Sequence, residues 1–191
     1  NVKNQPMGFA YWLMLCAGKS DDWINTFILN QYGKVIDGVP VYAEYDDTEH
    51  GRKLELSPID GKVIHVGVDF GLSPAISVGQ IHNGRANVLG ELCAKERSMG
   101  MRRFINDAVK PYLAERFGTV DRNGEAWRFK FWGDPAGNAR ADSDETTGFQ
   151  EIINANFDIE PAPTNNFSAR RDAVAWYLTK RNGFAMDRSC V

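Results

Sequence analysis

Val63-Ile64-His65-Val66-Gly67-Val68-Asp69 is the stretch of sequence that decides the fold. Its β-branched residues are typical of a buried central strand, and the strand ends in an acid. Gly71 and Pro74 follow and prevent the strand from continuing. A second stretch, residues 127–134, alternates in hydrophobicity and also ends in an acid, Asp134. We therefore predict two strands, each with a carboxylate at its C-terminal end.

The elements around these two stretches predict a mixed sheet. Residues 75–81 and 86–92 read as strands joined by a tight turn at residues 82–85, which makes an antiparallel meander with the first strand. Apolar residues then recur at helical spacing from Met101 to Leu113, with Pro111 expected to kink the last turn. Further on we predict a helix from Thr146 or Thr147, a strand at 159–161, a helix capped by Ser168 and a short strand at 184–186. The order predicts an α/β fold with helices on the faces of the sheet, similar to the ribonuclease-H-like fold.

The first third of the chain lacks strong periodicity. We predict that residues 1–60 form a linker or N-terminal subdomain, and that residues 61–191 form the main domain. Within the first segment we expect a helix at 7–17, a second from Asp21 or Asp22 to Tyr32, an extended piece at 39–42 and a polar loop at 46–51.

Composition limits the class of protein. The chain has 191 residues, a net charge of −3 and three cysteines. No two cysteines form a CxxC pair, which indicates reduced thiols rather than disulfides or a zinc site. The longest apolar run, residues 9–17, is too short to cross a bilayer. We expect a soluble intracellular protein with no membrane partner. The acidic balance argues mildly against a dedicated DNA-binding domain, but a nuclease can be acidic because its carboxylates hold cations.

Asp69 and Asp134 suggest a metal site. If the first and fourth strands are neighbours, both carboxylates lie at the same edge of the sheet and repel each other. A divalent cation removes that repulsion, and Mg²⁺ or Mn²⁺ prefers oxygen ligands. A two-metal site of this kind suits phosphodiester cleavage, because one ion activates water while the other stabilises the leaving oxygen. The alternative is that each acid only forms a turn with the residues that follow it.

Other side chains are candidates for the same site. Glu91 is a possible further metal ligand, on the assumption that the third strand borders the first; the alternative is an exposed strand residue. His65 shares strand parity with Asp69, although a hydrogen-bonded core histidine is the simpler interpretation. Five arginines are candidates for DNA phosphate contacts, with solvated surface charge as the alternative. Arg140 is the best single candidate, since it follows Asp134 by six residues, and the others are Arg102, Arg103, Arg170 and Arg171.

Several motifs together resemble the nuclease domain of the terminase large subunit of tailed bacteriophages. Val66-Gly67-Val68-Asp69-Phe70-Gly71-Leu72-Ser73-Pro74-Ala75 resembles the first nuclease motif, and Phe131-Trp132-Gly133-Asp134-Pro135-Ala136-Gly137 the second. Weaker similarities, which extend the resemblance over nearly the whole chain, are Gly38-Val39-Pro40-Val41-Tyr42 with His50, Val88-Leu89-Gly90-Glu91-Leu92, Pro161-Ala162-Pro163-Thr164-Asn165-Asn166 and Arg170-Arg171-Asp172-Ala173-Val174.

The resemblance implies a function. Such proteins join a packaging ATPase to a metal-dependent endonuclease that cuts concatemeric viral double-stranded DNA. It implies that Asp69 and Asp134 are metal ligands, that the portal, the small terminase subunit and an ATPase domain of the same polypeptide are partners, and that the protein works in the host cytoplasm. The family also has a third acid near the end of the domain. We expect that acid, and the end of the domain, to lie beyond Val191, because the only late aspartate, Asp187, looks like part of a short strand.

Two other functions stay open. A non-catalytic module that clamps DNA or docks within the packaging motor could keep this fold without a complete metal site. An ATPase of the actin, chaperone and sugar-kinase type also begins with a strand, an Asp-x-Gly and a meander. That fold needs two such halves, which disfavours it for a chain of this length.

Overall fold

The computed structural model describes residues 9–17, 24, 28, 40–51, 55–96, 99–135 and 146–190. The chain forms two compact units, residues 1–43 and 44–191. The described part of the first unit contains α1 (Phe9–Cys16), within the helix predicted at 7–17. The helix predicted from Asp21 or Asp22 to Tyr32 lies outside the described residues, apart from positions 24 and 28. None of the helices in the described part of the chain could cross a bilayer.

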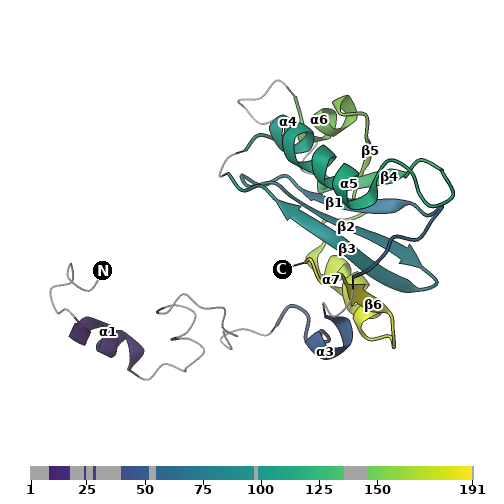
Figure 1. The fold of residues 1–191 in the computed structure, drawn as a ribbon. Coiled ribbons are helices and arrows are strands. Elements are labelled where there is room, and N and C mark those ends of the chain that lie inside the picture. The colour runs from purple at the N-terminus through teal and green to yellow at the C-terminus, as the bar shows by residue number, and fades with distance from the viewer. Residues whose placement is uncertain are drawn as a thin grey trace. The chain divides into compact units, whose positions relative to one another are not determined.

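A six-stranded mixed sheet organises the second unit (Figure 1). Its strands are β1 (Ile64–Asp69), β2 (Ala75–His82), β3 (Arg85–Cys93), β4 (Phe129–Gly133), β5 (Asp158–Pro161) and β6 (Phe184–Met186), in the spatial order β5-β4-β1-β2-β3-β6. The first three form the predicted antiparallel meander. The other three join in parallel, β4 beside β1, β5 beside β4 and β6 beside β3. The prediction of a mixed α/β sheet is confirmed.

The turn between β2 and β3 has the backbone that a tight hairpin needs. Asn83 and Gly84 have φ angles of 49° and 75°. Two consecutive residues with positive φ are typical of a two-residue hairpin turn, whose twist matches that of the strands, and asparagine followed by glycine is the preferred pair. This turn brings Arg85 to the start of β3 and fixes the far end of the meander.

The hydrophobic core lies between the sheet and the helices α4 (Met101–Arg103), α5 (Lys110–Phe117) and α6 (Gly148–Asn154). Figure 1 shows these three helices on one side of the sheet, with α3 (Asp47–His50) and α7 (Phe167–Leu178) on the other side, towards β6. Ile64, Val66 and Val68 alternate along β1 and are buried in this core. The intervening side chains of β1 face away from it, and the last of them is Asp69.

A π-helix, η2 (Phe104–Val109), connects α4 to α5, so the helical segment runs from Met101 to Phe117. Pro111, where we predicted a kink, does not end the helix, which continues for six residues beyond it. The π-helix, whose turns are wider than those of an α-helix, lies directly before the proline: Lys110 donates its N–H to the carbonyl of Ile105, five residues back. Such a turn helps a helix to accommodate a residue that lacks the N–H donor.

Three local predictions are wrong, because one turn and two side chains that cap helices were not identified from the sequence. Residues 41–44 form a turn rather than an extended piece. The polar loop at 46–51 contains α3, whose first turn is capped because the Asp46 carboxylate accepts from the N–H groups of Thr48 and Glu49. The cap of α7 is Asn166 rather than Ser168, since Asn166 accepts from the N–H of Ala169 at 3.0 Å.

Candidate active site

Asp69 and Asp134 lie at the C-terminal ends of two neighbouring parallel strands. In the parallel pair of β1 and β4 the final partners are Val68 and Gly133; Asp69 is the last residue of β1, and Asp134 directly follows β4. The predicted adjacency of the first and fourth strands is therefore confirmed. Both acids line one cavity of about 590 Å³, together with Glu91. The register thus brings two of the predicted site residues to the same edge and a third to the same cavity.

The ring of Phe70 packs closely against two glycines, Gly133 and Gly148. The ring of Phe70, the residue after Asp69, stacks on Phe149 of α6 with centroids 5.4 Å apart. A Cβ atom at Gly133 would lie 2.5 Å from the Phe70 ring, and one at Gly148 would also lie 2.5 Å from it. The glycine before Asp134 therefore makes room for the aromatic residue after Asp69. Sequence reasoning missed this contact, because each residue is ordinary in its own motif.

Both carboxylates are oriented by hydrogen bonds. Asp69 Oδ1 accepts from the backbone N–H of Gly71 at 3.0 Å, which is the turn that the alternative reading proposed. The turn does not remove Asp69 from the cavity, so the two readings are compatible. Asp134 Oδ1 accepts from the side-chain amide of Asn165 at 2.7 Å. Asn165 also lines the cavity and was not predicted as a site residue, because it is 31 positions from Asp134.

Glu91 reaches the cavity by a different route from the one predicted. The third strand does not border the first, because β2 lies between β1 and β3. Gly67 of β1 pairs with Ser77 of β2, and Ser77 pairs with Glu91 of β3, so these three residues share one face of the sheet. Two strand spacings separate Glu91 from β1 by roughly 10 Å. Glu91 therefore lines the side of the cavity and does not pair directly with Asp69.

The donor set suits a hard divalent cation. Carboxylate oxygens and an amide are the ligands that Mg²⁺ and Mn²⁺ prefer, and Mg²⁺ is commonly held by one or two carboxylates plus water. Within the described ranges, however, no three His, Cys, Asp or Glu side chains gather closely enough to hold a metal ion. The cavity thus offers a pair of ligands at its edge with a further carboxylate at some distance.

Asp187, the late aspartate, is part of the scaffold and not of the cavity. It follows β6, its side chain is 1% exposed, and it forms an ion pair with Arg116 at 3.0 Å. It also accepts from the backbone N–H groups of Leu56 and Ser189. Burial opposes its ionisation, but these hydrogen bonds outweigh burial and lower its pKa. Asp187 is therefore a buried structural carboxylate.

The predicted DNA-contacting arginines separate into two groups. Arg170, in the first turns of α7, lines the cavity. Three others form ion pairs: Arg102 with Glu151 at 2.9 Å, Arg103 with Glu96 at 2.7 Å and Arg171 with Glu44 at 2.8 Å. Arg140 lies outside the described residues. Of the four predicted arginines that the structure describes, Arg170 therefore lines the cavity and the other three do not.

His65 is a hydrogen-bonded neighbour of the site. Its Nδ1 accepts from the indole N–H of Trp132 at 3.0 Å, and burial lowers its pKa. A neutral ring is consistent with both observations, since Nδ1 must be unprotonated to accept. His65 does not line the cavity, whereas Trp132 does.

No protein-family model matches the sequence, and no curated protein sequence matches it. Solved structures do resemble the fold. The large terminase of a thermophilic bacteriophage has a TM-score of 0.58 at 13% identity, over 78% of this chain and 34% of that one. The large terminase nuclease domain of P22 has a TM-score of 0.56 at 10% identity, over 78% and 73%. The chain spans about a third of the thermophilic phage protein, and it has the ribonuclease-H-like fold of terminase nuclease domains.

Proposed function

We propose that this chain is a metal-dependent endonuclease domain of a phage terminase large subunit, which cuts concatemeric viral double-stranded DNA during packaging. One observation carries the proposal: Asp69 ends β1, Asp134 directly follows the adjacent parallel strand β4, and both line the same cavity. The terminase fold, the order of the motifs and the oxygen-only donor set support it. Partnership with the portal, the small terminase subunit and an ATPase domain of the same polypeptide, and a location in the host cytoplasm, belong to the same proposal.

In this proposal each cavity residue has its own task. Asp69 and Asp134 hold Mg²⁺ or Mn²⁺, which when bound activates water and stabilises the charge that develops on the scissile phosphate. The Gly71 N–H and the Asn165 amide hold one oxygen of each carboxylate and so fix its direction. Glu91, which lines the same cavity, would bind a second ion or its water. Arg170 supplies a positive charge for a DNA phosphate close to the acids.

Nicking of supercoiled plasmid tests the proposal. The wild-type chain is incubated with Mn²⁺, Mg²⁺ or EDTA, beside Asp69→Asn and Asp134→Asn. Asp158→Asn is the matched control, because Asp158 is an exposed strand carboxylate that pairs with Lys130 and lies outside the cavity. We expect metal-dependent nicking by wild type and by Asp158→Asn, and nicking at the EDTA level by the other two. Equal cutting by Asp69→Asn, Asp134→Asn and wild type would falsify the assignment.

A metal titration without DNA gives a second readout. Calorimetry with Mn²⁺ should show binding to wild type and to Asp158→Asn, with much weaker binding to Asp69→Asn and Asp134→Asn. Normal melting temperatures for all four proteins would show that the substitutions act on the site and not on folding.

A second function is a DNA-clamping or docking module that does not cut. The absence of a three-ligand cluster among the described residues favours it. This module binds duplex DNA equally well in Mn²⁺ and EDTA and produces no nicks. Binding without nicking, and without detectable Mn²⁺ affinity, would replace the nuclease proposal with this one.

A further inference from the structure

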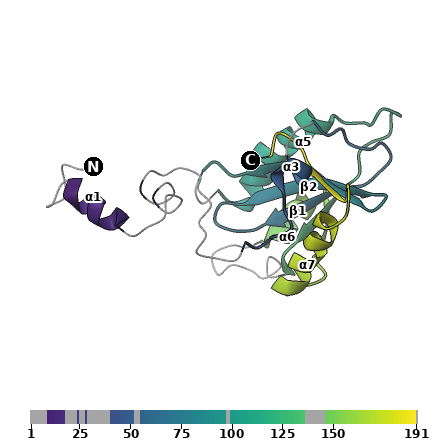
Figure 2. The same ribbon diagram turned by 90° about the horizontal axis from the view of Figure 1, so that it is seen from below.

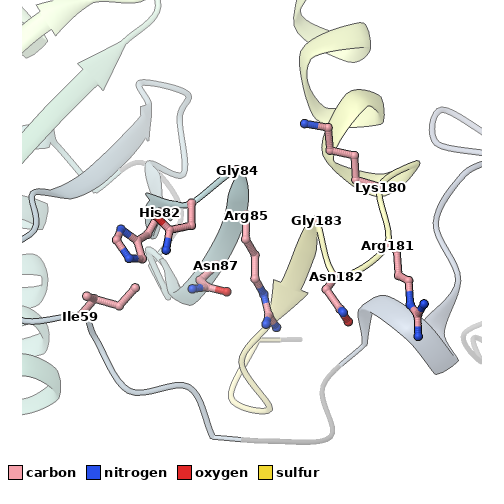
Figure 3. Close-up of a pocket in the computed structure, with 10 residues that line it drawn as sticks. Ile59, His82, Gly84, Arg85, Asn87, Lys180, Arg181, Asn182 and Gly183 are labelled. Atoms are coloured by element: carbon pink, nitrogen blue, oxygen red, sulfur yellow. The ribbon is translucent and has the colours of Figure 1, made fainter.

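A second cavity, of about 510 Å³, lies at the other end of the meander (Figure 3). It lies between the β2–β3 turn and the loop that joins α7 to β6. The charged and amide side chains that line it include Arg85, Asn87, Lys180, Arg181 and Asn182. All ten lining residues are basic, neutral polar, aliphatic or glycine, so none contributes a negative charge.

The sheet register brings the two loops together. Ala86 pairs with Phe184 in parallel, and the N–H of Ala86 donates to the carbonyl of Gly183 at 2.8 Å. Arg85 is therefore roughly one strand spacing, about 5 Å, from Gly183 in backbone position, and Arg181 is only two residues before that glycine. Figure 3 shows the guanidinium groups of Arg85 and Arg181 extending in the same direction, with the side chain of Asn182 between them.

Arg85 and Arg181 lack the carboxylate partner that five other described arginines have. Among the residues the structure describes, neither Arg85 nor Arg181 forms an ion pair, whereas Arg102, Arg103, Arg116, Arg171 and Arg188 all do. The Nε of Arg85 is also buried without a hydrogen-bond acceptor, and so is Asn87 Oδ1 without a donor. A buried donor without an acceptor is costly, so Arg85 Nε favours a ligand that brings acceptor oxygens, whereas Asn87 Oδ1 requires a donor such as water.

Lys180 has a different environment. Its ammonium lies over the Trp176 ring, 2.9 Å from the centroid, and Figure 3 shows it pointing away from the two guanidinium groups. The positive charge of the cavity therefore comes mainly from two arginines. Two planar guanidinium forks suit the tetrahedral oxygens of a phosphate better than a point charge does.

We propose that this cavity binds a phosphate group of the nucleic-acid backbone, at a site separate from the acid pair. Ala75 and His82 are the two ends of β2; Ala75 is the partner of Asp69, and His82 lines this cavity. The length of the strand separates them by roughly 23 Å, so a phosphate bound here is not the one being cut. The proposal goes beyond the nuclease function, because it holds equally for a module that binds DNA without cutting it.

Binding of a fluorescent duplex of about 20 base pairs, measured by anisotropy in EDTA, tests this site without any cleavage. The variants are Arg85→Gln and Arg181→Gln, and Arg122→Gln is the control, because Arg122 is an exposed arginine that lines neither cavity. We expect about fivefold weaker binding for each of the two variants and a salt dependence reduced by about one counterion. Affinity and salt dependence equal to those of Arg122→Gln would overturn the proposal.

Asn87→Asp provides a variant that should not impair folding. It is nearly isosteric and places a carboxylate beside Arg85, so we expect unchanged or higher thermal stability and weaker duplex binding. Inorganic phosphate separates the two possible sources of the ligand. If phosphate raises the melting temperature of wild type but not of Arg85→Gln, and duplex binding is unaffected by either arginine substitution, the ligand is the free ion and the nucleic-acid proposal is wrong. Loss of nicking in Asp69→Asn has no bearing on these outcomes.

Discussion

The two ends of the meander differ in the side chains that line their cavities: three carboxylates and one arginine at one end, and basic and amide side chains at the other. At one end Asp69 and Asp134 line a cavity, oriented by a backbone N–H and an amide. At the other end Arg85 and Arg181 line a cavity without an acidic residue. Between them, Arg116 and Asp187 form a buried ion pair whose charges cancel. The comparison separates charged side chains that line a cavity from Asp187, which is buried against an arginine and two backbone N–H donors.

The largest expected effect is on the buried pair. Asp187→Ala takes the shared acceptor away from the Arg116 side chain and from the N–H groups of Leu56 and Ser189. Arg116 keeps an ion pair with the exposed Glu55, at 3.8 Å. We expect a loss of about 3 kcal/mol in the free energy of unfolding, measured with urea. Nicking per folded molecule should stay at the wild-type level. Loss of nicking while the protein is still folded would mean that Asp187 takes part in DNA cleavage and is not a purely structural carboxylate.

Gly133→Ala tests the acid end. Its Cβ would overlap the Phe70 ring, which packs against Gly148 and Phe149 and has little room to move. We expect about 2 kcal/mol of destabilisation and slower nicking, because the shift of Phe70 also moves Asp69. Gly100→Ala is the control, since a Cβ there meets no atom within 4 Å. Wild-type nicking by Gly133→Ala would show that the packing of Phe70 does not position the acids.

Gly84→Ala tests the basic end. Gly84 has a φ of 75°, a conformation that costs alanine about 1 kcal/mol. Because Arg85 is the next residue, we expect duplex binding in EDTA to weaken while Mn²⁺ binding at the acid end is unchanged. Weakened Mn²⁺ binding in this variant would show that the two ends are not independent.

The smallest effect concerns Glu151 and the stability of the domain in acid. Hydrogen bonds from Arg102 and Thr146 lower the pKa of Glu151 and outweigh the opposing effect of burial. The pair therefore stabilises the protein above the unfolded carboxyl pKa, about 4.3, and this contribution disappears as the pH falls through the lower folded value. Glu151→Gln should lose about 0.5–1 kcal/mol at pH 7, because Arg102 is largely exposed, and less at pH 3. An equal loss at both pH values would mean that ionisation of Glu151 does not contribute.

Most strands of the sheet could be predicted, because the residue pattern that specifies a strand or a tight turn lies within the element itself. The β-branched run before Asp69 and the asparagine–glycine turn at 83–84 each specify their element without distant help. The order of the strands in the sheet depends on contacts between distant segments, which strand patterns do not show. For this reason we predicted that the strand of Glu91 borders the first strand, although β2 lies between them.

The surroundings of the site were harder to predict for the same reason. Whether an arginine is available depends on carboxylates far away in the chain, such as Glu44, which is 127 residues from Arg171. The amide that orients Asp134 is 31 residues from it. No periodicity or spacing in the sequence indicates such partners, since they meet only when the sheet and α7 have assembled.

Helix α7, labelled in Figure 2, joins a segment that lines the acidic cavity to a segment that lines the basic one. Asn165 and Arg170 at its beginning line the acidic cavity, and Lys180 and Arg181, just after its end, line the basic one. Its 12 residues make a rod of roughly 18 Å. A displacement of this rod along its axis would change both cavities at once, so a ligand that drew it towards one of them would alter the affinity of the other. Thermodynamics requires that influence to be mutual and of equal size in both directions.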